Sequence, residues 1–241
     1  MGRIEQNTDM ANVADTAVVT GSSSGIGLAL SRMLVKNGYE GIGFGRNFER
    51  AEAQEFCKEQ PEKFHAVVCD ITDTQALCAH IKEIDKNYRV TVLVNNAGVG
   101  YYGLHEELNP KKIQKMVRTN LEAPMILTQQ LLRTLKKNRG TVLNISSVTA
   151  AQSNPHGCAY GATKAGLSGF AKSLFDEVRK YGVRVITIQP DMAKTDLYRN
   201  ADFCEGEEEA SYLLPEEVAE AAAFALAQRA VSYTHLTLPT N

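Results

Sequence analysis

Short runs of apolar residues, many of them β-branched, alternate along this chain with longer stretches in which apolar positions recur at helical spacing. Such short runs are typical of buried strands, and the longer periodic stretches are typical of helices that pack on one face. The pattern predicts strands at 16–20, 40–44, 64–68, 90–94, 141–145 and 183–188. It predicts helices at 25–37, 48–60, 73–87, 110–137, 158–181 and 215–229.

A regular alternation of strand and helix favours an α/β fold in which a parallel sheet carries helices on both faces. No linker, repeat or low-complexity segment divides the pattern, so we expect one domain at 13–241 after a flexible N-terminal tail at 1–12. We interpret the polar stretch 196–214 as a mobile substrate lid. Residues 231–241 alternate enough to favour a last edge strand, although they also resemble translated adaptor sequence, which would not be the native C-terminus.

Composition narrows the classes of function. The 241 residues carry a formal net charge of −2, which gives no reason to expect nucleic acid or an anionic membrane as a partner. No apolar run reaches the length of a membrane span, and the segment MGRIEQNTDM at the start is not a hydrophobic signal segment. The five cysteines lack CxxC spacing and the five histidines lack metal-ligand spacing. We therefore expect a cytoplasmic protein with free thiols and no metal.

A glycine-rich segment, TGSSSGIG at 20–27, joins the first predicted strand to the first predicted helix. Glycines in such a segment permit a tight turn, close approach of a pyrophosphate and close helix–strand packing, while the helix N-terminus faces the anion. Glycines in tight turns are often only structural, so the position directly after the first strand is what favours a dinucleotide. The candidate ligands here are Gly21, Ser23, Ser24, Gly25, Ile26 and Gly27.

The end of the second predicted strand indicates which dinucleotide is preferred. Folds that prefer NAD usually place an acid about 20 residues beyond the glycine-rich loop, where it binds the ribose 2′-hydroxyl. Gly45 holds that place here and Arg46 follows. No carboxylate would repel a 2′-phosphate, and a guanidinium pairs well with one. An arginine that is merely solvated is the alternative, but the missing acid favours NADP over NAD.

Tyr160 and Lys164 are separated by one helical turn in the segment YGATK. Side chains four residues apart lie on the same face of a helix, so both would point the same way past three small residues. For an isolated YxxxK, a half-buried tyrosine beside a solvated lysine is the commoner outcome. The other motifs decide between the two interpretations.

Taken together, the motifs resemble those of the short-chain dehydrogenase/reductase family, in its short single-domain branch. They occur in the family's order as TGSSSGIG (20–27), CDI (69–71), NNAG (95–98), Asn120, SS (146–147), YGATK (160–164) and PDMAKT (190–195). The resemblance implies a single-domain Rossmann fold, with a doubly wound parallel sheet of order 3-2-1-4-5-6-7. It also implies an NADP-dependent oxidoreductase that acts on a carbonyl/secondary alcohol pair, the CH–OH group of donors.

The resemblance assigns four catalytic residues. Tyr160 would be the general acid in reduction and the general base in oxidation. Lys164 and an oxidised nicotinamide would lower the tyrosine pKa from about 10, and Lys164 would also bind the nicotinamide ribose. Ser147 would hold the substrate oxygen. Asn120 would hold open the backbone and a proton-relaying water, with an ordinary helical asparagine as the alternative.

Further cofactor contacts are implied by the same resemblance. Asp70 and Ile71 would contact the adenine, and Thr195 the carboxamide of the nicotinamide. The complete set implied beyond the glycine-rich loop is Arg46, Asp70, Ile71, Asn96, Ala97, Gly98, Tyr160, Lys164, Pro190, Met192 and Thr195.

One position departs from the family, because Asp191 follows Pro190 where glycine is usual. If that position needs the conformational freedom of glycine, Asp191 predicts a strained or repositioned loop, although an aspartate that simply faces outward is the alternative. The substrate is not specified by the sequence. Candidate lining residues are Tyr101, Tyr102, 154–158 and 196–214.

Two other functions and the assembly state were weighed. A non-catalytic NADP-binding sensor on the same fold is the alternative function, but such proteins tend to lose the tyrosine or lysine. A nucleotide-sugar epimerase needs a substrate domain that a chain of this length lacks. The family pairs helices that match 110–137 and 158–181 across a two-fold axis, which implies a homodimer or homotetramer.

Overall fold

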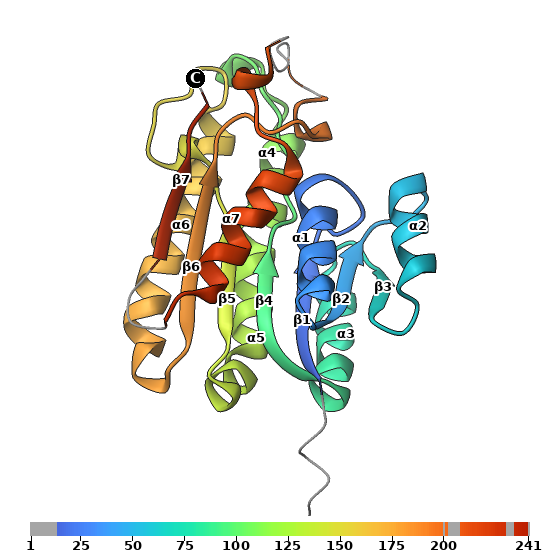
Figure 1. Ribbon diagram of the computed structural model, residues 1–241. Helices are drawn as coiled ribbons and strands as arrows, with labels where there is room; N and C mark the ends of the chain where they lie inside the picture. Colours follow the sequence, from blue (N-terminus) through green and yellow to red (C-terminus); the bar gives the residue numbers. More distant parts are fainter. Residues whose placement is uncertain (1–13, 200, 202–207, 230–233, 241) are drawn as a thin grey trace, which may run out of the picture.

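Seven strands pair in parallel in the order β3-β2-β1-β4-β5-β6-β7, with helices on both faces of the sheet (Figure 1). This computed structural model describes residues 14–199, 201, 208–229 and 234–240. The predicted fold class and strand order are therefore confirmed. The expected tail at 1–12 lies outside the described residues, as do 200 and 202–207 of the expected lid.

The strands are β1 (Asp15–Thr20), β2 (Glu40–Gly45), β3 (Phe64–Val68), β4 (Arg89–Asn95), β5 (Thr141–Ile145), β6 (Arg184–Pro190) and β7 (Thr234–Leu238). The helices are α1 (Gly25–Lys36), α2 (Ala51–Glu59), α3 (Thr74–Asn87), α4 (Pro110–Val117), α5 (Ala123–Asn138), α6 (Cys158–Val178) and α7 (Pro215–Ala227). No helix in the described ranges combines the length and apolar character needed to traverse a bilayer.

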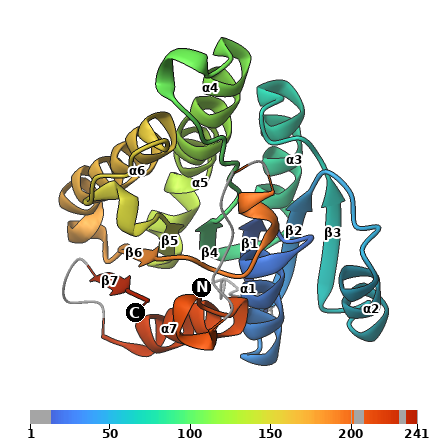
Figure 2. The same ribbon diagram turned by 90° about the horizontal axis from the view of Figure 1, so that it is seen from above.

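Alternate residues of the central strands enter two separate cores, as expected for a sheet covered on both sides. Along β1, Val18 packs toward α3, α5 and α6, whereas Ala17 and Val19 pack toward α1 and α7. Figure 2 shows these two helical layers on opposite sides of the strands. The continuous apolar runs that predicted the strands thus supply both cores at once.

The helix predicted at 110–137 is not a single α-helix. Asn109 caps its start and Pro110 occupies the first turn, a combination that favours helix initiation. The α-helical pattern then stops at Val117, continues as a π-helical turn at Arg118–Glu122, and resumes as α5. Such turns occur frequently at functional sites. The turn contains Asn120, whose side chain is bonded to the backbone of another segment, as described below.

The segment after β6 is not strained at Asp191. Among the described non-glycine residues, positive φ angles occur at Arg139 and His156, not at Asp191. The Asp191 N–H donates to the Leu238 carbonyl at 3.0 Å, and its Oδ1 accepts the N–H of Met192 at 2.9 Å. The strain that would arise if this position needed a glycine is therefore absent. The hydrogen bond to Leu238 joins this segment to β7, which lies within the doubtful stretch 231–241.

Candidate active site

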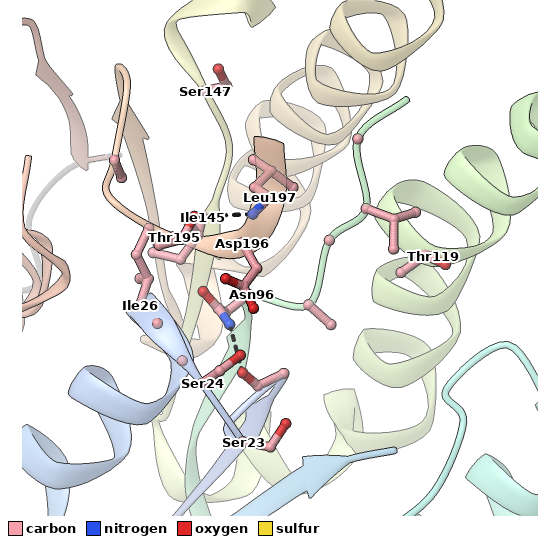
Figure 3. Close-up of a pocket in the computed structure, with 18 of the residues that line it drawn as sticks. Ser23, Ser24, Ile26, Asn96, Thr119, Ile145, Ser147, Thr195, Asp196 and Leu197 are labelled. Atoms are coloured by element: carbon pink, nitrogen blue, oxygen red, sulfur yellow. Dashed lines mark hydrogen bonds between the residues drawn. The ribbon is translucent and has the colours of Figure 1, made fainter. Parts of the chain in front are cut away.

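A cleft opens at the carboxyl ends of the strands, between the β1–α1 loop and the segment that follows β6. The strand order reverses between β1 and β4, and ligands of open α/β sheets bind at such a point. Every predicted catalytic or cofactor-binding residue lines this cleft except Asn120 and Met192. The candidate substrate-lining residues Tyr101, Tyr102 and 154–158 do not line it. Figure 3 shows Ser23 and Ser147 at opposite ends of the labelled side chains.

The floor of the cleft is glycine backbone. A Cβ built on Gly27 would lie 2.1 Å from the carbonyl oxygen of Gly21, a distance that no side chain can occupy. Gly21 itself has φ +70°, in the left-handed region that favours glycine. The side chain of Asn96, at the end of β4, donates to the Thr20 carbonyl at 2.8 Å and so fastens this loop to the next strand. The first turn of α1 therefore faces a space that is lined here by glycine main chain and by the side chains of Ser23, Ser24 and Ile26.

At the opposite edge from α6, Arg46 and Asp70 follow β2 and β3. The Oδ1 of Asp70 accepts hydrogen bonds from the N–H and the hydroxyl of Thr72, at 2.9 and 2.8 Å. Burial acts to raise the pKa of Asp70, but these bonds and the charges of Arg46 and Lys115 outweigh it and hold that pKa below its usual value. Asp70 is thus an ionised acceptor in a locally positive environment.

Tyr160 and Lys164 lie on the buried face of α6, with only 3% and 4% of their surface exposed. The Nζ of Lys164 donates to the Ile145 carbonyl at 2.9 Å and lies 5.8 Å from the centroid of the Tyr160 ring. The structure therefore brings the two side chains together as the four-residue spacing predicts. A solvated lysine beside a half-buried tyrosine is excluded by the burial of both.

The two serines at the end of β5 differ in their partners. The Ser146 hydroxyl donates to the Lys164 carbonyl at 3.1 Å and lies 2.9 Å from the Ser168 hydroxyl, so it is occupied by α6. The Ser147 Oγ accepts the hydroxyl of Thr149 at 3.0 Å, and it also interacts with Tyr160. Both residues line the cleft, but only Ser147 shares a contact with the tyrosine hydroxyl.

Asn120 acts on the backbone rather than in the cleft. Its Oδ1 accepts the Val99 N–H and its Nδ2 donates to the Val99 carbonyl, both at 2.9 Å. The same Nδ2 donates to the Thr163 hydroxyl at 3.1 Å. Asn120 therefore joins the π-helical turn, the segment after β4 and α6. Met192 is also outside the cleft lining, with its carbonyl accepting the Leu213 N–H at 2.7 Å.

Comparison with known proteins decides the family. The family model for short chain dehydrogenases matches residues 15–203. This chain belongs to the short-chain dehydrogenase family. It is 38% identical over 186 residues to serine 3-dehydrogenase of Agrobacterium fabrum, a match that covers 76% of this chain and 74% of the relative.

Solved structures give the same result at the level of the fold. An alcohol dehydrogenase from the archaeon Thermococcus sibiricus, complexed with 5-hydroxy-NADP, superposes with a TM-score of 0.82 at 28% identity, covering 94% of this chain and 96% of that one. The 3-ketoacyl-(acyl-carrier-protein) reductase of Brucella melitensis, complexed with NADH, gives a TM-score of 0.83 at 26% identity, covering 93% and 96%. The chain is thus an oxidoreductase of a family with nicotinamide-dependent members.

In this short-chain dehydrogenase, burial shifts the pKa values of both members of the central pair. Burial raises the pKa of Tyr160, Tyr198 adds to the rise, and the hydrogen bond with Ser147 opposes it. Burial lowers the pKa of Lys164 to about 8. The predicted lowering of the tyrosine pKa needs both Lys164 and an oxidised nicotinamide, so it stays a prediction for the complex. In the protein alone, burial is the largest influence on the pKa of each group.

The lining residues that were not identified from the sequence include Lys115 and Thr119, which reach the cleft from α4 and the π-helical turn. Asp196, in the predicted lining stretch 196–214, reaches the cleft from the segment after β6. The carboxylate of Asp196 pairs with Arg50, so its charge is compensated. Thr119 could have been predicted as a site residue because it directly precedes Asn120. No sequence feature distinguishes Lys115 from the other lysines on α4. The described residues contain no cluster of metal-ligating side chains.

Proposed function

We propose that this chain is an NADP-dependent oxidoreductase that transfers a hydride between the nicotinamide and a carbonyl/secondary alcohol substrate, with Tyr160 as general acid and base. The observation that supports this most directly is the buried pair Tyr160 and Lys164 beside Ser147, in a cleft at the strand-order reversal. A dinucleotide sensor has no need of a phenol, an ammonium and a hydroxyl at one point.

The residues present fit a dinucleotide. Gly27 lets the first turn of α1 pack closely against the β1–α1 loop, and Gly21, Gly25 and Gly27 all line the cleft without a side chain. Ser24 precedes α1 in an extended conformation and its side chain makes no capping hydrogen bond. The N–H groups of that turn are therefore available to an anion, and they would hold the pyrophosphate, while Lys164 would hold the nicotinamide ribose.

The roles proposed for Tyr160, Ser147 and Lys164 follow from which of these groups can donate a proton or a hydrogen bond. When bound, the nicotinamide supplies the hydride that reduces the carbonyl carbon. Tyr160 carries its proton in the protein alone, because its pKa is raised, and donates it to the oxygen that gains negative charge. Ser147 donates a hydrogen bond to the same oxygen and orients it. The ammonium of Lys164 can donate three hydrogen bonds, and one of them goes to the Ile145 carbonyl.

The preference for NADP over NAD rests on charge. Arg46 lines the cleft and is exposed, and both Arg46 and Lys115 act on Asp70. Two cations at this end favour a 2′-phosphate over a 2′-hydroxyl. Titration of the protein with NADPH and NADH, followed by the fluorescence of the reduced nicotinamide, tests this. Equal affinity, or tighter binding of NADH, contradicts the preference.

The names of the similar proteins suggest which substrates to test. Serine 3-dehydrogenase is named for a hydroxy amino acid, and 3-ketoacyl-(acyl-carrier-protein) reductase is named for an acyl thioester. Oxidation of NADPH should therefore be measured over a panel of carbonyl compounds that includes 3-oxo acids, 3-oxo thioesters and simple ketones, with serine tested in the reverse direction. A protein that binds NADPH tightly and turns over none of the panel would favour the sensor.

We also propose a cytoplasmic homo-oligomer, a dimer or a tetramer. The apolar residues that motivated this from the sequence do not all support it, because Met116, Leu131 and Leu167 are buried within the single chain. Val117 and Met125, at the ends of α4 and α5, remain 41% and 37% exposed. Light scattering tests the assembly, and a monomeric mass at micromolar concentration contradicts it.

A further inference from the structure

Two adjacent tyrosines follow β4, and the structure gives them different surroundings. The ring of Tyr102 lies 5.5 Å from the ring of Tyr160 and 6.0 Å from the ring of Tyr198, centroid to centroid. Tyr101 instead lies under the Nζ of Lys112, at 5.3 Å. Tyr102 therefore contacts both the proposed proton donor and a residue of the segment after β6, whereas Tyr101 belongs to the α4 surface.

The main chain fixes the position of the Tyr102 ring. A Cβ on Gly100 would lie 2.7 Å from Cε2 of Tyr102, so the ring rests against bare backbone. Gly103 has φ +134°, and its N–H donates to the His156 carbonyl at 2.8 Å. His156, in turn, adopts a left-handed φ of +65° just before α6. A non-glycine residue held there costs free energy, which the surrounding contacts must supply.

The three tyrosines form one continuous wall at the end of the cleft. Tyr160 and Tyr198 line the cleft, and Tyr102 contacts both rings without lining the cleft itself. Aromatic rings at these distances attract one another beyond the area that they bury. Burial raises the pKa of Tyr102 first of all, with further increases from Tyr160 and Tyr198, which agrees with a wall that excludes water.

We propose that Tyr102 is a positioning residue that limits substrate size: its ring holds Tyr160 and Tyr198 together and so confines the carbonyl pocket to small substrates. This inference rests on the proposed function. We therefore expect a carbonyl compound with a short side chain to bind between Ser147 and this wall. A longer side chain must displace Tyr198, and the contact of Tyr198 with Tyr102 opposes that displacement.

The test compares side-chain length within each of two homologous series, the methyl 3-oxo esters and the 2-ketones. For each variant, kcat and KM are measured with NADPH on the shortest and on the longest members. Tyr102→Ala should raise the ratio of kcat/KM for long over short substrates by about tenfold or more, the scale of a methylene-sized change in a pocket. It should also lower kcat on the short members, because Tyr160 loses its lateral contact. NADPH affinity should not change.

The chain provides matched controls. Tyr101→Ala removes an equal ring from the same loop and should leave the length ratio unchanged, while Tyr102→Phe keeps the ring and should keep the wild-type ratio. If Tyr102→Ala does not fold, Tyr198→Ala opens the same wall from the other side and should shift the ratio in the same direction.

Two results overturn the inference, and they are distinguishable from failure of the proposed function. An unchanged length ratio in a folded Tyr102→Ala or Tyr198→Ala enzyme refutes it while the oxidoreductase activity stands. An equal shift in Tyr101→Ala refutes it as well, because the effect would then belong to the loop. A wild-type protein that binds NADPH but reduces no carbonyl compound removes the proposed function, and this inference with it.

Discussion

At the β1–α1 loop the wall of the cleft is built around closely packed glycine main chain, whereas beyond Tyr160 it consists of aromatic side chains carried on connecting segments. Gly21 and Gly27 approach so closely that a Cβ on Gly27 would meet a carbonyl oxygen at 2.1 Å. On the other side, Tyr102 and Tyr198 come from segments nearly a hundred residues apart and meet through their rings. Under the proposed function, the first wall faces the phosphates of the cofactor, which do not vary, and the second faces the substrate, which does.

This difference in construction predicts a difference in the response to substitution. A wall of backbone tolerates no added atom, because packed main chain cannot move aside cheaply. A wall of side chains tolerates changes in size and responds by changing which substrates fit. Substitutions on the cofactor side should therefore affect folding and cofactor affinity, and those on the substrate side should affect turnover and selectivity.

The largest effect is expected at the boundary between the two walls, for Tyr160→Phe. The change removes one oxygen and leaves the ring contact with Tyr102 in place. Turnover should fall by about 10²–10⁴-fold, the range of a positioned acid–base group. NADPH affinity should stay near the wild-type value, because no proposed phosphate or ribose contact is lost. Steady-state rates with a fluorescence titration measure both.

Tyr101→Phe is the control for this change, since Tyr101 lies near Lys112 and not near Tyr160. It should keep full turnover. If Tyr160→Phe retained most of its activity on a substrate that the wild type turns over, another group would have to donate the proton.

Gly27→Ala should be next in size and should act on the cofactor side. The new methyl group would lie 2.1 Å from the Gly21 oxygen and 2.4 Å from Nδ2 of Asn96. We expect a loss of about 1–3 kcal/mol in the free energy of unfolding, together with weaker binding of both NADPH and NADH. Urea denaturation and cofactor titration provide the measurements.

Gly169→Ala is the matched control, because a Cβ at Gly169 would have no neighbour within 4 Å and the residue lies inside α6. Alanine stabilises an exposed helix position relative to glycine by about 1 kcal/mol. Stability should therefore rise or stay constant in this variant. A Gly27→Ala protein as stable as Gly169→Ala would show that the loop can yield.

Arg46→Ala should have a smaller and more selective effect. Loss of the proposed charge-assisted hydrogen bond to the 2′-phosphate should weaken NADPH binding by about 1–3 kcal/mol and leave NADH binding almost unchanged. The measurement is the ratio of the two dissociation constants. Arg199→Ala, a change to an exposed arginine that lines the cleft from the segment after β6, provides the comparison. Equal losses for both cofactors after Arg46→Ala would contradict 2′-phosphate recognition.

The difference between the main-chain wall and the side-chain wall also explains which features could be predicted from the sequence. The spacing of the glycines could be recognised in the sequence because only glycine fits where two main-chain segments pack this closely. The spacing of Tyr160 and Lys164 could be recognised because side chains four residues apart lie on the same face of a helix. The strands followed from apolar runs that supply two cores. Their order came from the resemblance to the family and not from the pattern.

What the sequence could not predict depends on contacts between distant segments. The π-helical turn at Asn120 is fixed by its two hydrogen bonds to Val99, a partner 21 residues away. Asp191 is unstrained because Leu238 accepts its N–H. The raised pKa of Tyr160 is a property of its burial, which no spacing reveals. Whether Tyr101 or Tyr102 would meet Tyr160 was likewise undecidable, because the two residues are identical and adjacent.

The smallest expected effect is a pH dependence of NADPH affinity that arises from the protonation of Lys164. Burial lowers the pKa of this lysine to about 8 in the protein alone. In the proposed complex its ammonium donates to the nicotinamide ribose, which favours the charged form and raises the pKa. Above pH 8 the free protein has lost this proton and must take it up to bind. NADPH affinity should therefore be constant below about pH 8 and should fall above it, by about tenfold per pH unit at most.

Fluorescence titration from pH 7 to pH 9.5 measures this dependence at constant ionic strength. Lys164→Met keeps the length of the side chain but has no proton to exchange, so its affinity should be weaker at pH 7 and flat with pH. Arg46→Ala should shift the whole NADPH curve to weaker binding and keep its slope, because Arg46 stays charged throughout. If Lys164→Met retained the wild-type slope, the linked proton would belong to another group. The ribose contact proposed for Lys164 would then lose its support.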